Sequence, residues 1–161
     1  MKSDLLKPAS RGRDLSALSP VWLCDVWGVV HDGRRAHEAA CGALHMHRKS
    51  GGCVVLITNA PRPAPAVIQQ MREFGVPDEA YDATVTSGDV TRELLLRWRG
   101  GNGFLIGPEE DHPLVAGLPV TFTGLDEASA VLVTGLRHDG RNGGPAEQPE
   151  DYRAEMREIA R

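Results

Sequence analysis

One apolar run near the start of the chain constrains the fold more than any other feature. Residues 21–30 read VWLCDVWGVV, so a single carboxylate, Asp25, interrupts an otherwise uncharged stretch that turns at Gly28. An apolar run of this kind is typical of a strand in a buried parallel sheet. A carboxylate at the end of such a strand is costly to desolvate unless a cation or hydrogen-bond donors meet it. Asp25 is therefore either the cap of a turn or a functional residue.

The following residues alternate between short apolar runs and helical patterns. This alternation predicts an α/β fold with a doubly wound parallel sheet. Parallel strands joined by right-handed crossovers end at the same edge of their sheet. We therefore expect Asp25, Thr58 and Ser87, which follow or end the three runs, to lie along one edge. The predicted strands are 21–24, 53–57 and 83–86, and the predicted helices are 36–49, a stretch from the prolines at 61–65 to Gly75, and 87–98.

The chain changes character after the glycine-rich residues 100–103. Short strands are predicted at 104–106, 120–122 and 130–134, followed by a glycine-rich loop at 139–149 and a helix that begins at Pro149. This last helix reaches Arg161 without a glycine or another stop signal. We therefore expect the polypeptide to stop partway through a larger fold.

Composition narrows the possible partners. The formal net charge of −4 argues against a nucleic-acid-binding surface, and no apolar run is long enough to cross a membrane. Residues 1–20 carry charges and lack the apolar core of a secretory signal. The three cysteines form no CxxC pair, so reduced thiols and a cytoplasmic location are expected.

Three motifs together resemble a known family. Residues 24–33 (CDVWGVVHDG) and 56–63 (LITNAPRP) resemble the first and second motifs of the haloacid dehalogenase-like (HAD) superfamily, in its class IIA, NagD-like branch. Residues 86–95 (TSGDVTRELL) resemble the serine-led helix that precedes the cap domain of that branch. The resemblance implies a partial Rossmann-like HAD core over 21–99 and a partial α/β class II cap over 100–161. Residues 1–20 are polar and are interrupted by Pro8, Gly12 and Pro20, so we interpret them as an N-terminal arm or a short lead-in helix.

The resemblance also implies an activity, which is phosphoryl transfer from a small phosphorylated metabolite through an aspartyl-phosphate, assisted by Mg²⁺. Asp25 matches the nucleophile, and Thr58 matches the residue that binds the phosphoryl group, with Asn59 beside it. Backbone N–H groups at Trp27 and Gly28 are expected to cradle the phosphoryl oxygens. The Asp25 carboxylate and the Trp27 carbonyl are the expected metal ligands.

Further substrate contacts are predicted in the segments that follow the second and third strands. Arg62 and Ser87 are candidates for contact with an anionic substrate, although an exposed loop arginine is common in any protein. His37, Cys41 and His45 share a helix face at intervals of four residues. That spacing suits zinc, but a half-exposed helix face is the better interpretation.

Two departures from the family pattern bear on activity. The usual second aspartate, which acts as general acid and base, is Trp27 here, and an indole cannot accept a proton at neutral pH. Loss of such a group typically costs about 10²–10⁴ in rate. Asp32 is either a substitute or a turn former.

The second departure is that residues 100–161 show no counterpart of the family's phosphate-binding lysine or its acidic metal motif. We therefore expect a truncated phosphatase with impaired activity. The alternative is a non-catalytic module that binds phosphate and Mg²⁺ or acts in regulation. Either form would leave an open sheet edge, through which self-association is expected.

Overall fold

The chain folds into two compact units. The computed structural model describes residues 12–98, 100–138 and 145–160. The first unit contains the described residues up to Ala60 together with Ala64–Thr86, and the second contains Pro61–Pro63 and the described residues from Ser87 onward. Most of the predicted N-terminal arm, residues 1–11, lies outside the described residues, and so do residues 139–144 of the predicted glycine-rich loop. The core and cap boundaries predicted from the sequence stay a prediction.

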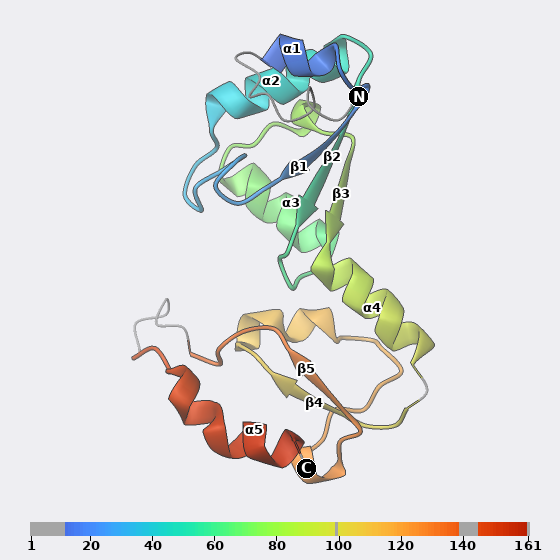
Figure 1. Cartoon of the computed structure of the whole chain (residues 1–161), viewed down its shortest axis with the longest axis vertical. Coiled ribbons are helices and arrows are strands. Elements are labelled where there is room, and N and C mark those ends of the chain that lie inside the picture. The colour runs from blue at the N-terminus through green and yellow to red at the C-terminus, as the bar shows by residue number, and fades with distance from the viewer. Residues whose placement is uncertain (1–11, 99, 139–144, 161) are drawn as a thin grey trace, which may run out of the picture. The chain divides into compact units, whose positions relative to one another are not determined.

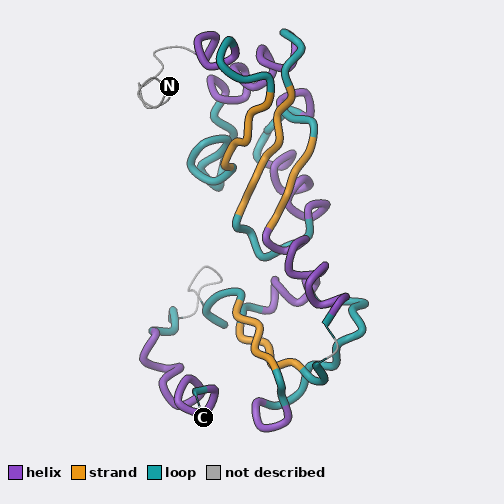
Figure 2. The backbone as a smooth tube through the Cα atoms, turned by 45° about the vertical axis from the view of Figure 1, so that its right-hand side comes forward, coloured by secondary structure: helices purple, strands orange, loops and turns teal. Residues whose placement is uncertain are grey.

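A parallel sheet forms the centre of the first unit. Among the described residues its strand order is β1 (Val21–Asp25), β2 (Cys53–Thr58) and β3 (Ala83–Thr86), and Figure 2 shows the three strands side by side. Asp25 pairs with Ile57, and Thr58 pairs with Thr86. The predicted α/β class and the incomplete Rossmann-like core are therefore confirmed.

Helices α2 (Glu38–Lys49) and α3 (Ala64–Glu73) cover one face of this sheet (Figure 1). The buried side chains of α2 include Cys41 and Leu44, and those of α3 are Val67 and Met71. These four pack with Val54 and Leu56 of β2 into one apolar core. The burial of β1 alternates strictly, because residues 21, 23 and 25 are exposed and residues 22 and 24 are half-buried. The core therefore lies on the helix side of the sheet.

A buried histidine joins the start of the chain to this core. His47, at the end of α2, is 2% exposed, and its ring stacks on that of Trp22 with centroids 4.0 Å apart. One ring nitrogen lies 2.9 Å from the Ser16 hydroxyl of α1 (Gly12–Ser16), and the other lies 3.3 Å from the Pro20 carbonyl. His47 therefore fixes α1 and the entry to β1 against α2.

The second unit is built around a small parallel pair. β4 (Gly103–Ile106) pairs with β5 (Ala130–Val133), and α4 (Ser87–Arg97) precedes them. The Arg92 side chain of α4 donates to the carbonyls of Leu114 and Ala116. The remaining elements are 3₁₀ turns at Asp78–Ala80 (in the first unit), Glu109–Leu114, Leu125–Glu127 and Pro149–Tyr152, and α5 at Arg153–Ile159.

One predicted strand is wrong. Residues 120–122 form no ladder, because Phe122 makes only an isolated bridge with Gly103. Thr121 accepts one hydrogen bond from the Gly103 N–H at 2.8 Å, and the chain then turns toward Leu125–Glu127. The β-branched residues indicated a strand, but only Phe122 of these three residues pairs with the neighbouring strand β4.

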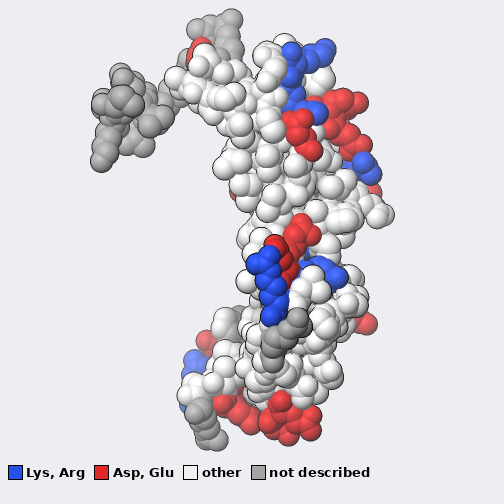
Figure 3. Space-filling model, turned by 90° about the vertical axis from the view of Figure 1, so that its right-hand side faces the viewer, with Lys and Arg blue, Asp and Glu red and all other residues white. Residues whose placement is uncertain are grey.

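Charges are mixed on the face of the molecule shown in Figure 3, where Lys and Arg side chains lie beside Asp and Glu. Within the described ranges no helix combines the length and apolar character needed to cross a bilayer.

A partly buried ion pair beside β3 generates a pH prediction. The Asp82 carboxylate lies 2.7 Å from the Arg48 guanidinium and accepts the Val54 N–H at 2.8 Å. These two partners, Arg48 first, lower the pKa of Asp82. A lowered carboxyl pKa stabilises the fold above the unfolded value, about 3.9, and the effect is lost as the pH falls through the folded pKa.

We expect Asp82→Asn to lower the urea midpoint at pH 7 and to match the parent protein at low pH, where the parent carboxyl is protonated. The control is Asp78→Asn, which breaks the ion pair between Asp78 and Arg72. These two side chains are 54% and 59% exposed. Because solvent screens this pair, its loss should lower the urea midpoint less than the loss of the Asp82 pair. Equal effects of the two substitutions at pH 7 would contradict this interpretation.

Candidate active site

Asp25 occupies the carboxyl end of the edge strand β1. Its side chain is exposed, and one carboxylate oxygen accepts the Val26 N–H at 2.8 Å. Strand alternation places Asp25 on the same face as its register partner Ile57, which is the face without helices. A carboxylate in this position is accessible to a ligand at the edge where ligands bind in open α/β sheets.

Thr58 ends the neighbouring strand at the same edge. It follows Ile57, so strand alternation assigns its side chain to the covered face, where it is 8% exposed. The Thr58 hydroxyl oxygen accepts the Ala60 N–H at 3.2 Å, which leaves the hydroxyl hydrogen to be donated. Asn59 follows and is exposed. Asp25 and Thr58 are thus neighbours along the edge, and their side chains lie on opposite faces of the sheet.

The loop after Asp25 is closed by its own backbone. The Gly28 N–H donates to the His31 carbonyl at 2.8 Å, and the Val30 N–H donates to the Val26 carbonyl at 2.8 Å. Gly28 has a φ of +75°, which favours glycine, as the predicted sharp turn requires. The Gly28 N–H already donates to the His31 carbonyl, so it can bind a phosphoryl oxygen only if that hydrogen bond breaks.

An aromatic cluster supports the exposed indole of Trp27. Trp27 is 62% exposed, and its ring meets the His31 ring edge-on with centroids 5.7 Å apart. On the other side of His31, the Phe74 ring lies 5.0 Å away. The Trp27 ring also lies against Gly33, where a Cβ would come within 2.3 Å of the indole. The Trp27 indole therefore packs against both His31 and Gly33 while much of it stays exposed.

Two titratable groups of this loop have structural partners. Burial lowers the pKa of His31, whose Nδ1 accepts the Gly33 N–H at 3.0 Å. The Asp32 carboxylate accepts the N–H groups of Arg34 and Arg35, each at 2.9 Å, and these bonds lower its pKa. Of the two interpretations of Asp32, the structure supports the turn former.

Arg62 and Ser87 belong to the second unit, whereas Asp25, Trp27, Gly28, Thr58 and Asn59 belong to the first. The Arg62 backbone packs against Gly88, where a Cβ would come within 2.4 Å of it. Ser87 begins α4 and directly follows Thr86, the register partner of Thr58. Their predicted contact with substrate stays a prediction.

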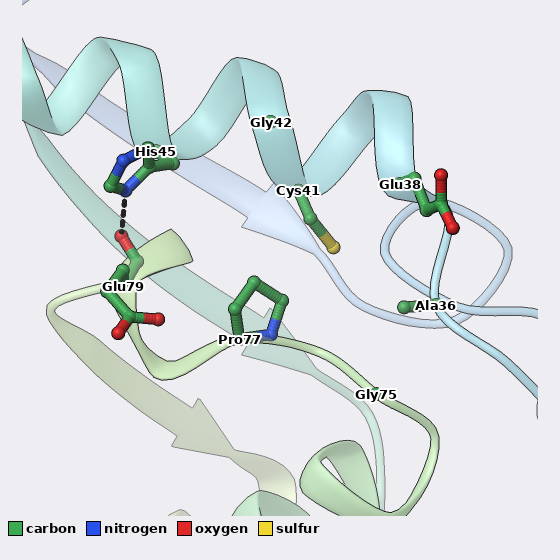
Figure 4. A pocket seen from close by; sticks show the side chains of 8 residues that line it. All are labelled: Ala36, Glu38, Cys41, Gly42, His45, Gly75, Pro77 and Glu79. Atoms are coloured by element: carbon green, nitrogen blue, oxygen red, sulfur yellow. Dashed lines mark hydrogen bonds between the residues drawn. The ribbon is translucent and has the colours of Figure 1, made fainter.

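The cavity drawn in Figure 4 does not include these residues. It has a volume of about 540 Å³ and lies between α2 and the segment after α3. One wall carries Cys41 and His45, and the other carries Pro77 and Glu79. The His45 ring lies 3.3 Å from the Glu79 carbonyl oxygen, and Cys41 is directed to the Val30 carbonyl. Among the described residues no group of three metal-binding side chains gathers, so the zinc alternative gains no support.

Comparison with known proteins identifies relatives of this fold. A family of haloacid dehalogenase-like hydrolases matches residues 22–119. A haloacid dehalogenase-like hydrolase structure from Brucella suis has 40% identity and a TM-score of 0.86, and the match covers 96% of this chain and 57% of that one. No protein of curated function matches.

Two further structures are more distant. NagD from Escherichia coli K-12 has 23% identity and a TM-score of 0.56, with 87% of this chain and 50% of that chain covered. A glycerol phosphate phosphatase from Mycobacterium tuberculosis, solved with calcium, has 25% identity and a TM-score of 0.55, with 75% and 36% covered. The present chain therefore spans between 36% and 57% of the length of these three structures. The predicted membership of the haloacid dehalogenase-like family is confirmed by the family match and by the Brucella suis structure.

Sequence reasoning missed the role of His31 as the anchor of the loop. The structure buries this histidine at 5% exposure between the Trp27 and Phe74 rings. No local signal predicts this burial, because Phe74 reaches His31 from a distant part of the sequence.

The contact between Trp27 and Gly33 generates a stability prediction. Gly33→Ala places a methyl group against the indole at a φ of +84°. We expect a loss of about 2–4 kcal/mol in the free energy of unfolding, from backbone strain and overpacking together, measured by urea titration. Gly51→Ala is the control, since Gly51 has a φ of +88° and nothing within 4 Å of its Cβ position. An equal loss in both variants would show that Trp27 does not rest on Gly33.

Proposed function

Because this chain belongs to the haloacid dehalogenase-like hydrolase family, we propose that it provides the nucleophilic part of a phosphatase for small phosphorylated metabolites. The observation that carries the proposal is the exposed Asp25 carboxylate at the carboxyl end of β1, one register position from Thr58. A similar structure, the glycerol phosphate phosphatase, supports this substrate class. The proposed place of action is the cytoplasm, without a nucleic-acid or membrane partner.

The proposed reaction has two displacements. A carboxylate oxygen of Asp25 attacks phosphorus, and the bond from phosphorus to the ester oxygen breaks, so that the leaving alcohol takes up a proton. Water then attacks the aspartyl-phosphate, which releases phosphate and restores the carboxylate. Thr58 donates its hydroxyl hydrogen to a phosphoryl oxygen, because its oxygen already accepts the Ala60 N–H. Asn59, and the Trp27 and Gly28 backbone, complete the proposed phosphate site.

The donor set of this loop fits a loosely held Mg²⁺ ion. Mg²⁺ is usually bound through one or two carboxylates and substrate phosphates, and it keeps several waters. The Asp25 carboxylate and the Trp27 carbonyl would be its protein ligands, and the described residues offer no larger cluster of metal-binding side chains. When bound, the ion neutralises charge on the phosphoryl group. The weak donor set is consistent with the proposed impairment.

Trp27 bears directly on the proton steps. Its indole is 62% exposed and donates through a single N–H, so it neither protonates the leaving alcohol nor activates water. Solvent must protonate the leaving alcohol and accept the proton of the attacking water, which predicts slow turnover. The same observation favours a second candidate function, a non-catalytic module that binds phosphate and Mg²⁺. Binding without phosphoryl transfer would distinguish this candidate.

The nucleophile can be identified by trapping. With Mg²⁺ and a small phosphodonor such as acetyl phosphate, we expect one phosphoryl group to be added, measured by intact mass and removed by hydroxylamine. Asp25→Asn should abolish the mass gain. Asp32→Asn is the control, because its carboxylate lies in the same loop and is engaged with backbone N–H groups. A phosphoryl group that persists in Asp25→Asn would overturn the proposal.

A second substitution restores the missing carboxylate. Trp27→Asp should increase the hydrolysis rate of phosphate monoesters with Mg²⁺ by about 10²–10⁴, the usual value of a general acid and base. Trp27→Asn is the matched control, because it removes the indole without adding a proton-transferring group. If both variants have the same rate, the absent carboxylate is not what limits turnover.

A further inference from the structure

The cavity between α2 and the segment after α3 plays no part in the proposed phosphatase chemistry. It has a volume of about 540 Å³, and Figure 4 shows that its walls come from two segments of the first unit. Small or apolar groups form its middle, namely Ala36, Cys41, Gly42, Gly75 and Pro77. A concave surface that is mostly apolar, with a few polar groups at defined places, is the usual form of a small-molecule site. The polar groups of this cavity therefore indicate which ligand it takes.

An acidic residue lies toward each end of the cavity. Glu38 begins α2, whereas Glu79 lies beside His45, whose ring is 3.3 Å from the Glu79 carbonyl oxygen (Figure 4). His45 follows Glu38 by seven residues, which corresponds to about 10 Å of helix rise. The two carboxylates therefore flank the apolar middle of the cavity from opposite ends.

Both carboxylates are available to a ligand. Glu38 and Glu79 are exposed, and within the described part of the chain neither side chain has a hydrogen bond or an ion pair. The Glu79 backbone carbonyl is already used by Arg48 and His45, but its carboxylate is not. The other described acidic residues of the first unit have interaction partners, and these are Asp14, Asp25, Asp32, Glu73, Asp78 and Asp82. The cavity thus brings together two uncompensated negative charges.

Gly42 leaves space between these two acids. It lies inside α2, where glycine is less favourable than other residues because it loses more backbone freedom on folding. Its φ is not positive, and a Cβ at this position would meet nothing within 4 Å. Neither backbone strain nor close packing therefore requires glycine here, whereas a long side chain would narrow the cavity that Gly42 lines.

We propose that this cavity binds an aliphatic diamine or polyamine. One protonated nitrogen lies at Glu38 and another at Glu79, and the methylene chain lies along Cys41 and Pro77. An ammonium group donates up to three hydrogen bonds and complements a carboxylate, and methylene groups gain free energy when they leave water. The proposal does not depend on the phosphatase chemistry, because none of the residues that line the cavity belongs to the proposed phosphate site.

The test is a titration of the full chain with diaminopentane, followed through the backbone amide signals by NMR. We expect the signals of residues 36–45 and 75–79 to shift, with a dissociation constant on the order of 1 mM, because exposed ion pairs add little affinity. Aminopentane has one cationic end and should bind about two- to fivefold more weakly. Added salt should weaken binding of the diamine more than binding of aminopentane.

Three variants locate the site. Glu38→Gln and Glu79→Gln should each weaken diamine binding about two- to fivefold. Glu73→Gln is the matched control, because Glu73 is also exposed but ends α3 and does not line the cavity.

A fourth variant fills the space without removing a charge. Gly42→Leu should abolish diamine binding, and urea titration should show that the variant is at least as stable as the parent protein, because leucine is the better helix former.

Four results would overturn the proposal. The first is that the amide signals stay unchanged at millimolar diamine, and the second is that aminopentane binds as tightly as the diamine. The third is that Glu73→Gln weakens binding as much as Glu38→Gln. The fourth is that a lysine-rich peptide occupies the cavity and the diamine does not displace it. Asp25→Asn should bind the diamine like the parent protein, so failure of the proposed phosphatase activity would be distinguished from failure of this proposal.

Discussion

The parallel pairing of β1 with β2 is the interaction on which the candidate site depends. Its register sets Asp25 opposite Ile57 and therefore brings Asp25 and Thr58 to neighbouring positions at one sheet edge. The same pairing decides which side chains enter the core. Val54 and Leu56 turn toward α2 and α3, whereas Leu23 and Ile57 turn away. A shift of β1 by one residue would turn Asp25 to the covered face and Trp22 and Cys24 away from it, so the register is strongly specified.

The loop after β1 explains how an unusual residue is tolerated beside the proposed nucleophile. Trp27 rests on Gly33 and on the edge of His31, and His31 in turn contacts Phe74. Trp27 is thus integrated into the packing of the loop. Because an indole does not transfer protons at neutral pH, this arrangement is consistent with the slow proton transfer that we propose.

Much of the fold could be predicted from the sequence where local patterns act alone. The apolar runs located β1, β2 and β3 to within a residue, and the glycines and prolines marked the helix ends. Distant contacts were not predictable. Residues 120–122 have strand-forming side chains but only one bridging partner, and His47 is buried by Trp22 and Ser16, which lie far from it in sequence. The engagement of the Gly28 N–H by His31 likewise depends on loop closure and has no sequence signal.

A crystal structure of the chain with Mg²⁺ and beryllium fluoride would test the central claim most directly. Beryllium fluoride mimics a phosphoryl group bound to a carboxylate. The account predicts beryllium bonded to an oxygen of Asp25, with the Thr58 hydroxyl donating to a fluoride and the ion beside them. Fluoride bound elsewhere, or an Asp25 carboxylate that stays in solvent away from Thr58 at saturating fluoride, would contradict it.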